Sequence, residues 1–304
     1  MGVSERERER PAAPVRCAGL IAKRTPERLA PVIETVCAVL AEHGVKVLLD
    51  KECAKHLGRP NEGVARRTFN GKVDVGICIG GDGTFLSVAR KFAPFGTPVL
   101  GVNLGRLGFL TEVEADGFGA FFAKLQSGGC VVQERTMLEA HVAGEEHRPD
   151  VAVLNDVVIA KAALARMLEF DVAVDGRFLT RYRADGLILS TPTGSTAYSL
   201  AAGGPIVIPH LDVVTVTPIC PHALSQRPIV LPADAEIRVC LSGSVNDVYL
   251  SLDGQVGSPL AADAEIIVRR SRHVTRVVRD PDVSFHDLLR QKLGWGEHSR
   301  GARG

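Results

Sequence analysis

The chain has 304 residues, of which 45% are hydrophobic and 23% are charged, and its formal net charge at pH 7 is +1. These values predict a globular protein with one large domain or two ordinary ones, and the near-neutral charge gives no electrostatic reason to expect a nucleic acid or an anionic membrane as a partner. The seven cysteines are scattered without a C-x-x-C pair, which argues against a zinc site and a disulfide framework and fits the reducing cytoplasm.

The N-terminal segment is strongly charged. Residues 5–10 alternate acidic and basic side chains, and Pro11 and Pro14 follow. This segment has no apolar run of the signal-peptide kind, and nowhere does the chain hold about eighteen consecutive apolar residues, so we expect neither a secretory signal nor a transmembrane span. Polar, proline-containing sequence is typical of disorder. We therefore predict a disordered tail over residues 1–14 and a cytoplasmic location.

The first half of the chain alternates strand and helix signals. Four apolar runs are predicted to be strands: residues 15–22, 45–49, 73–79 and 97–102. Between the first two, Thr25 and Pro26 are typical of a helix start, and Gly44 is typical of a helix end. Strands separated by helices predict a doubly wound parallel α/β domain, which we place at residues 15–135. Such sheets bind ligands at the carboxyl ends of their strands.

A glycine-rich turn follows the third predicted strand, and a helix is predicted after it; the turn is Gly80, Gly81, Asp82, Gly83 and Thr84. A strand, a glycine turn and a helix N-terminus form an anion site, because free backbone N–H groups and the helix dipole favour phosphate. Asp82 could hold Mg²⁺ there or take the proton of an attacking hydroxyl, and either role belongs to phosphoryl transfer. The alternative is a plain tight turn with Asp82 capping the helix, because short glycine motifs give many false positives.

The pattern changes near residue 135. Short alternating segments with turns between them, such as the hairpin signal Asp175-Gly176, predict an antiparallel β domain over residues 136–280. A helix is predicted at residues 284–293. It belongs to a C-terminal segment, residues 281–304, that we expect to return to the α/β domain and to end in a frayed tail.

The densest polar motif of the second half runs from Asp185 to Pro205. It begins as an apolar strand, passes through a hydroxyl-rich turn and becomes a short helix, predicted over residues 196–202. Hydroxyl and N–H groups at a helix start can donate to an anion or a ribose, and Tyr198 offers a flat face to a base. The alternative is a polar turn with ordinary caps.

Further polar residues are candidates for ligand contacts. Asn155 and Asp156 interrupt an apolar strand, and an amide beside a carboxylate can hydrogen-bond a base edge or two ribose hydroxyls. His222 lies in a proline-rich loop, where a structural role is at least as well supported, and residues 253–255 could form only a hairpin turn. Three cations could face phosphates, although exposure to solvent is the usual fate of such residues: Lys161, Arg166 and Arg183.

Together these motifs resemble those of the NAD kinase family, and the resemblance covers nearly the whole chain after the tail. It rests on residues 80–84, 103–110, 155–156, 185–205, 222–228, 253–255 and 292–295. The Gly-Gly-Asp-Gly element is shared with diacylglycerol and sphingosine kinases and with phosphofructokinases, so it marks only the superfamily. The segment 193–198 with its flanks is the specific part.

The resemblance implies an α/β domain and an antiparallel β-sandwich domain that phosphorylate NAD at the 2′-hydroxyl of the adenosine ribose. ATP would be the phosphoryl donor, a divalent metal (Mg²⁺ or Mn²⁺) would assist, and NADP would be the product. The chain would form a homodimer or homotetramer. The general base falls on Asp82, and no metal ligand is assigned. The positions implied to bind NAD or ATP are Gly80, Gly81, Gly83, Thr84, Asn155, Asp156, Arg166, Arg183, Asp185, Thr196, Ala197, Tyr198, Ser199, Leu200, Ala201, His222 and Gln255.

Two other functions remain open from the sequence. A lipid kinase of the diacylglycerol or sphingosine type would use the same glycine turn, but the sequence shows no membrane-facing amphipathic helix or basic patch, and segment 193–198 would have no role. A non-catalytic NAD(P) sensor would bind the dinucleotide without turnover, and the intact Asp82 argues against it.

Overall fold

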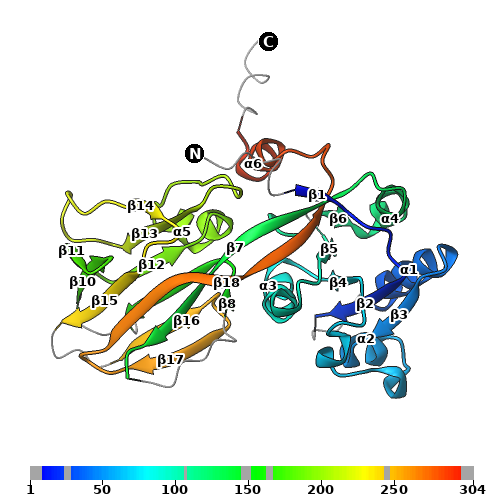
Figure 1. Cartoon of the computed structure of the whole chain (residues 1–304), viewed down its shortest axis with the longest axis horizontal. Helices are drawn as coiled ribbons and strands as arrows, with labels where there is room; N and C mark the ends of the chain where they lie inside the picture. Colours follow the sequence, from blue (N-terminus) through cyan, green and yellow to red (C-terminus); the bar gives the residue numbers. More distant parts are fainter. Residues whose placement is uncertain are drawn as a thin grey trace, which may run out of the picture. The chain divides into compact units, whose positions relative to one another are not determined.

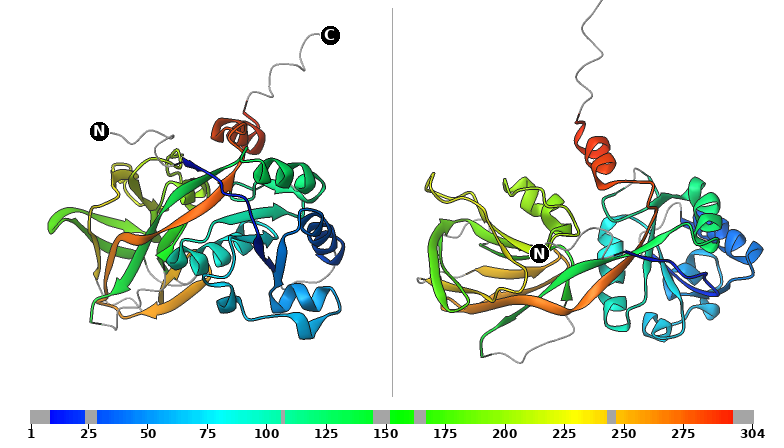
Figure 2. Two further views of the ribbon diagram at one scale, coloured as in Figure 1. Left: turned by 45° about the vertical axis from the view of Figure 1, so that its right-hand side comes forward. Right: turned by 45° about the horizontal axis from the view of Figure 1, so that its top comes forward.

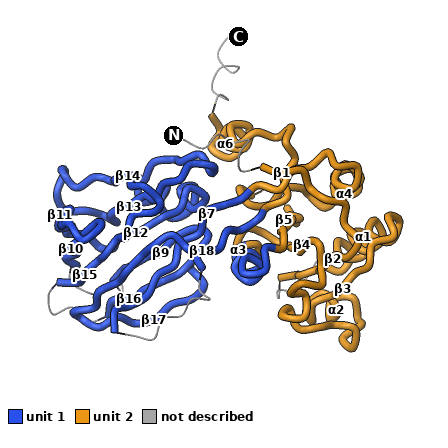
Figure 3. Tube along the Cα trace, viewed as in Figure 1, with its two compact units in different colours: residues 1–8, 86–96, 134–276 blue, residues 9–85, 97–133, 277–304 orange. Residues whose placement is uncertain are grey.

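The chain divides into two compact units in the computed structural model (Figure 3). The structure describes residues 9–23, 29–105, 108–144, 152–161, 167–242 and 247–295. Unit 1 consists of residues 1–8, 86–96 and 134–276, and unit 2 of residues 9–85, 97–133 and 277–304. Three elements contribute residues to both units: α3 (Asp82–Phe92), β7 (Val131–Val142) and β18 (Glu265–Arg279).

Unit 2 is built on a parallel sheet with the strand order β5-β4-β2-β3 (Figure 1). Its strands are β2 (Cys17–Ala22), β3 (Lys46–Leu49), β4 (Val75–Ile79) and β5 (Val99–Asn103). The short β6 (Val113–Glu114) also pairs with β5 in parallel, and Val277 near the end of β18 pairs with Val99. The central strands are buried along their whole length, which is typical of a parallel sheet covered on both faces.

Helices cover both faces of this sheet. The helices α1 (Leu29–Glu42) and α4 (Phe118–Gln126) lie side by side (Figure 2) and share one apolar core with the sheet. On the other face, a Cβ on Gly101 would lie 3.0 Å from the ring of Phe85 in α3, so this glycine allows the close approach of helix and strand. The predicted doubly wound domain is confirmed. The unit also contains α2 (Lys51–His56), α6 (Phe285–Leu293) and 3-10 helices at Pro60–Glu62, Arg66–Phe69 and Ala115–Gly117.

Unit 1 is a sandwich of two antiparallel sheets. One sheet has the order β14-β13-β12-β9-β16-β17, with bounds Ile229–Pro232, Val213–Ile219, Gly186–Ser190, Asp156–Lys161, Val248–Leu252 and Val256–Leu260. The other has the order β11-β10-β15-β18, with the first three at Arg177–Ala184, Leu168–Val174 and Ile237–Ser242. In addition, β7 pairs with β18 and with β8 (Ala152–Val153). Side chains of both sheets, such as Leu187 and Phe170, form one buried core, as the predicted β-sandwich requires.

Helical elements are few in unit 1. Besides the C-terminal part of α3 it holds α5 (Tyr198–Ala201) and 3-10 helices at Ala93–Phe95 and Thr193–Thr196. Asp175 and Gly176 both have positive φ, 49° and 74°, in the turn between β10 and β11, so the hairpin predicted there is confirmed. No helix in the described residues is long and apolar enough to cross a membrane.

The predicted disordered tail is wrong for Glu9–Pro11. These residues form β1, which pairs antiparallel with residues 131–133 of β7, and Gln133 Nε2 donates to Glu9 Oε1 at 2.9 Å. An edge strand offers unpaired backbone groups to any extended segment that reaches it, and the composition of the tail does not show this. Residues 1–8 and the helix start predicted at Thr25 and Pro26 lie outside the described residues.

Candidate active site

The glycine turn joins β4 to α3 in unit 2, as predicted. Gly80 N–H donates to the carbonyl of Val102 on the neighbouring strand at 2.9 Å. A Cβ on Gly80 would lie 2.8 Å from Thr84 Oγ1, and its φ is +156°, so only glycine fits here without strain. The carbonyl of Gly81 accepts the N–H groups of Thr84 and Phe85, the first hydrogen bonds of the helix. Gly83 in the first turn is exposed.

Asp82 lies at the start of α3, and backbone donors hold its carboxylate. Phe109 N–H donates to Asp82 Oδ2 at 3.0 Å, and Leu110 N–H donates to Asp82 Oδ1 at 3.2 Å. A Cβ on Gly108 would overlap this carboxylate, so Gly108 gives the space in which Asp82 lies. The two motifs predicted at the ends of adjacent strands therefore meet, and the residue that joins them is Asp82.

The loop that holds Asp82 has its own internal support. Gly108 N–H donates to the hydroxyl of Thr111 at 2.7 Å, and Thr111 is 1% exposed. At the start of the loop, the amide oxygen of buried Asn103 accepts the N–H of Leu104 at 2.8 Å. The described residues of this loop are thus held by local hydrogen bonds at both ends. Residues 106 and 107 are outside the described part of the chain.

A second group of polar residues gathers in unit 1 around Asp253. This residue lies in the turn between β16 and β17, has φ +52° and is buried. Its carboxylate accepts three consecutive backbone N–H groups, those of Leu154, Asn155 and Asp156, at 3.1, 2.7 and 3.3 Å. Residues 253–255 therefore form more than a hairpin turn. They fix the break between β8 and β9, where Asn155 lies.

Arg90 and Gln255 complete this group. Arg90 lies in the part of α3 that belongs to unit 1, and its Nη2 is 3.8 Å from Asp253 Oδ2 and donates to Gln255 Oε1 at 2.8 Å. Burial raises the pKa of Asp253, while the three amide donors and Arg90 oppose that rise. Neither Asp253 nor Arg90 was assigned a role from the sequence, because an acidic residue before a glycine is an ordinary turn signal and a lone arginine on a helix is an ordinary surface residue.

Asn155 and Asp156 have side chains with unused hydrogen-bonding capacity. The buried Oδ1 of Asn155 has no hydrogen-bond partner among the described residues, although such atoms are paired in most proteins. Asp156 is 5% exposed, and burial, followed by the negative charge of Asp253, raises its pKa to about 7. The Asp156 carboxyl group is therefore divided between its protonated and ionised forms near neutral pH, and can donate as well as accept.

The hydroxyl-rich turn packs directly against Asn155. A Cβ on Gly194 would overlap the backbone carbonyl of Asn155, and Thr191 N–H donates to that carbonyl at 2.9 Å. The hydroxyls expected to face a ligand are partly used inside the fold: Ser195 Oγ donates to the carbonyl of Pro192 at 2.7 Å, and Ser199 Oγ shares a hydrogen bond with Thr217 at 3.1 Å.

The helix predicted over residues 196–202 is wrong in its extent. A 3-10 turn ends at Thr196, Ala197 has φ −99° and ψ −128°, which no helix contains, and α5 covers only Tyr198–Ala201. The non-helical backbone of Ala197 interrupts the helical conformation, so the 3-10 turn and α5 are two separate elements. Tyr198 is 47% exposed, and Ala201 is exposed as well, so this short helix presents both to solvent, with Leu200 half-buried between them.

Four of the predicted ligand contacts lie elsewhere or are not described. Register pairs Asp156 with Ser190 and Ala160 with Gly186, so Asp185 lies opposite Lys161, about 20 Å along the strands from Asn155. Its carboxylate pairs with Lys161 at 2.7 Å, and Arg183 pairs with Glu169 at 3.0 Å. His222 is exposed and donates its backbone N–H to the carbonyl of Arg183. Arg166 lies outside the described residues.

Comparison with known proteins decides the family. A model of the ATP-NAD kinase N-terminal domain matches residues 18–129, and a model of the ATP-NAD kinase C-terminal domain matches residues 154–280. The chain belongs to the NAD kinase family. The NAD kinase of Geobacter metallireducens is 47% identical over 259 residues, which cover 85% of this chain and 91% of that protein.

Solved structures agree with this assignment. Yeast NADH kinase complexed with NADH superposes with a TM-score of 0.82 at 28% identity, over 95% of this chain and 91% of that one. An NAD kinase from Archaeoglobus fulgidus in complex with ATP superposes with a TM-score of 0.68 at 25% identity, over 88% of this chain and 94% of that one. The resemblance found in the sequence is confirmed, and so is the predicted enzyme class: an NAD kinase that uses ATP. The comparisons give no support to a lipid kinase or to a non-catalytic sensor.

The raised pKa of Asp156 predicts how the stability of this NAD kinase depends on pH. The folded protein binds the Asp156 proton more tightly than the unfolded chain, whose carboxyl titrates near 3.8. This stabilisation is complete below pH 3.8 and is lost as the pH rises through about 7. Asp156→Asn has no such dependence. Between about pH 5 and about pH 8, the wild type should therefore lose about 2.5 kcal/mol more unfolding free energy than this variant does.

Urea unfolding of the ligand-free protein at the two pH values measures this difference. The matched control is Asp234→Asn, which changes an exposed carboxylate of the same unit and should follow the wild type at both pH values. A constant difference between Asp156→Asn and the wild type across this range would contradict the prediction.

Proposed function

We propose that this NAD kinase transfers the terminal phosphoryl group of ATP to the 2′-hydroxyl of the adenosine ribose of NAD, giving NADP, with a divalent metal, Mg²⁺ or Mn²⁺. The observation that carries the proposal is the Asp82 carboxylate, fixed by Phe109 and Leu110 in a glycine turn at the N-terminus of α3. An acceptor hydroxyl needs a proton acceptor at the site where phosphate is held.

Asp82 is the proposed general base. Each of its oxygens accepts one backbone N–H, and each carboxylate oxygen has two lone pairs, so both retain the capacity to accept a further proton. The two donors also fix the direction of the carboxylate before the substrate arrives. Such preorganisation favours catalysis because no reorientation is needed during the reaction.

The glycine turn is the proposed phosphate site. Its backbone N–H groups and the positive end of the α3 dipole favour the charged donor, and the contacts fall on Gly80, Gly81, Gly83 and Thr84. The described residues contain no cluster of three or more His, Cys, Asp or Glu side chains that could hold a metal. Mg²⁺ in kinases is usually held by one or two carboxylates together with substrate phosphates and water. Bound there, the metal would neutralise charge on the transferring phosphoryl group.

Asn155 and Asp156 are the proposed contacts to NAD. The unpaired Oδ1 of Asn155 can accept from a ligand N–H or hydroxyl. Asp156 is the next residue, and no side chain or backbone group of the described residues forms a hydrogen bond with its carboxyl group. The exposed ring of Tyr198 offers a stacking face to a base. The remaining predicted contacts, including Arg183, Asp185, His222 and Gln255, stay predictions.

We also propose that the protein forms a homodimer or homotetramer in the cytoplasm. The location is supported by the cysteines, because all seven are free and free thiols are typical of reducing compartments. The oligomer rests on the family resemblance. Size-exclusion chromatography with light scattering would measure the assembly directly.

The experiment that tests the proposed function is NADP formation by the purified protein supplied with NAD, ATP and Mg²⁺. Parallel reactions omit ATP, omit the metal, or replace NAD with a diacylglycerol dispersion. We expect product only in the complete reaction, and phosphorus NMR of the product should place the new phosphate on the 2′-oxygen. A folded protein that binds NAD but forms no NADP would overturn the proposal, as would faster phosphorylation of the lipid.

A further inference from the structure

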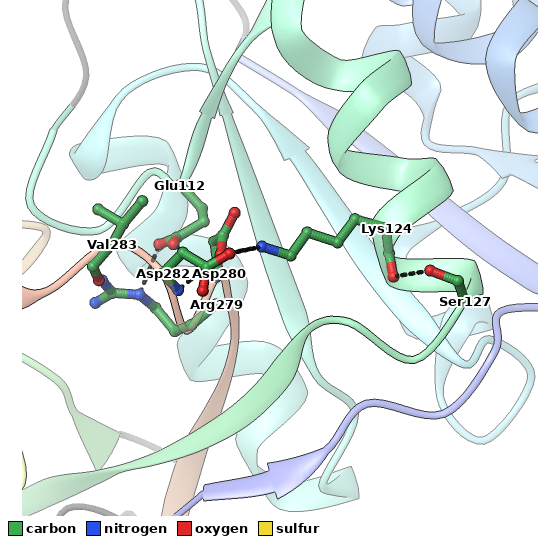
Figure 4. Close-up of polar contacts among 7 residues, drawn as sticks. All are labelled: Glu112, Lys124, Ser127, Arg279, Asp280, Asp282 and Val283. Carbon is green, nitrogen blue, oxygen red and sulfur yellow. Dashed lines mark hydrogen bonds and ion pairs between the residues drawn. The ribbon is translucent and has the colours of Figure 1, made fainter.

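The end of β18 and the segment after it contact the loop that holds Asp82. In unit 2, the Arg279 guanidinium forms an ion pair with Glu112, with Nε 2.7 Å from Oε2 (Figure 4). The two side chains are 8% and 4% exposed. The other oxygen of Glu112 accepts the backbone N–H of Asp280 at 2.9 Å. One oxygen of this buried carboxylate thus accepts a hydrogen bond from Asp280, and the other makes a charge contact with Arg279, whose Nε lies close to it without an aligned hydrogen bond.

Glu112 is linked to Asp82 through a few consecutive residues. Its own N–H donates to the carbonyl of Gly101 on β5 at 2.9 Å, and it directly follows Thr111, whose hydroxyl accepts the N–H of Gly108. The intervening residues, Phe109 and Leu110, donate their N–H groups to Asp82. The contacts that hold Glu112 therefore also hold the end of segment 108–112, whose backbone N–H groups bind the Asp82 carboxylate.

A ring contact also supports this segment. The rings of Phe109 and Phe285 have centroids 6.4 Å apart and are tilted by 49°. Phe285 is the first residue of α6 and is buried. The end of β18, the connection after it and the start of α6 thus reach the loop at two places, the carboxylate of Glu112 and the side chain of Phe109.

The chemistry of the pair points to positioning and not to stability alone. A buried ion pair is often no more stabilising than well-packed apolar residues of similar volume, because both charges lose their hydration. What the contact adds here is a fixed position for the Glu112 carboxylate, because a guanidinium charge lies 2.7 Å from one oxygen and the Asp280 N–H binds the other at 2.9 Å. We propose that Arg279 and Glu112 are positioning residues for Asp82: they hold the 108–112 segment so that its amides aim the catalytic carboxylate. This inference rests on the proposed role of Asp82.

Lys124 provides a matched control on the same segment. Its ammonium group binds the carboxylates of Asp280 and Asp282 at 2.6 and 2.5 Å (Figure 4). These hydrogen bonds raise the pKa of Lys124. Lys124 thus ties the residues after β18 to α4, and its ammonium group makes none of the bonds that join Glu112 to the loop. Removing its charge takes away the two side-chain ion pairs of Asp280 and Asp282, and leaves in place both groups that contact the Glu112 carboxylate, the Arg279 guanidinium and the backbone N–H of Asp280.

The test is steady-state kinetics of Glu112→Gln and Arg279→Lys. In Glu112→Gln, the amide oxygen can still accept the N–H of Asp280, while the amide NH₂ faces the Arg279 guanidinium, donor against donor. Arg279→Lys keeps the charge and replaces the planar guanidinium with a flexible ammonium group. We expect kcat to fall about 10- to 100-fold in Glu112→Gln and less in Arg279→Lys, as for a misplaced catalytic group, while KM for NAD and for ATP stays within about twofold. Lys124→Gln should keep the wild-type kcat.

A double-mutant cycle with Asp82→Asn separates positioning from a general structural role. If Glu112 acts through Asp82, Glu112→Gln causes little further loss in the Asp82→Asn background. Equal losses in both backgrounds would overturn the inference, and so would a wild-type kcat in Glu112→Gln or a matching loss in Lys124→Gln. A failure of the proposed function would give a different result: the wild type would form no NADP, or Asp82→Asn would keep full turnover.

Discussion

Asp82→Asn is expected to lower kcat for NADP formation by about 10³-fold, within the range that a general base contributes. The asparagine amide cannot accept the proton of the ribose hydroxyl. Its oxygen can still accept one of the N–H groups of Phe109 and Leu110 that now hold the carboxylate, so the loop loses one hydrogen bond, worth about 1 kcal/mol. The affinity for NAD should change by no more than about twofold, because the variant alters a group proposed for the chemical step.

Initial rates at saturating NAD and ATP, together with calorimetric titration of NAD, measure the two quantities separately. Asp116→Asn is the matched control, since it makes the same isosteric change at an exposed carboxylate of the same unit and should keep the wild-type rate. A near-normal kcat in Asp82→Asn would remove Asp82 from the mechanism. A loss of NAD affinity as large as the loss of kcat would show that the side chain binds substrate and does not act as the base.

The sequence predicted the parts of the fold and site that depend on neighbouring residues. The buried strand β4, the glycine turn and the helix α3 follow one another without interruption, so an apolar run, three glycines and helical spacing were enough to predict them. The alternation of strands and helices likewise predicted the parallel sheet of unit 2, and the short segments with turns predicted the antiparallel strands of unit 1.

The features that the sequence did not predict depend on contacts between distant residues. Glu9–Pro11 is a strand only because β7 offers an edge more than a hundred positions later. Asp253 looks like a turn residue until its carboxylate meets three backbone amides that lie 97 to 99 positions earlier. In the same way, Ser195 and Ser199 could each face a ligand or the fold interior, and only the packing of the turn shows that both hydroxyls bind inside the protein.

Gly108→Ala should produce the second large loss of activity. The methyl group would overlap the Asp82 carboxylate, so either the side chain or the loop must move, and the hydrogen bonds from Phe109 and Leu110 must change with it. We expect kcat to fall about 100-fold, the effect of a displacement of roughly 1 Å at a reacting group.

The same loop contains the control for this substitution. A Cβ on Gly105 would meet no heavy atom within 4 Å, so Gly105→Ala makes an identical chemical change in the same loop with no collision, and it should keep a rate close to that of the wild type. Thermal unfolding of both variants then tests whether a loss of kcat in Gly108→Ala comes from general instability. If Gly108→Ala has a low kcat but unfolds at the same temperature as Gly105→Ala, the loss of activity comes from a displaced Asp82 carboxylate and not from a loss of stability. If the two alanine variants have equal rates, the contact between Gly108 and Asp82 has no part in catalysis.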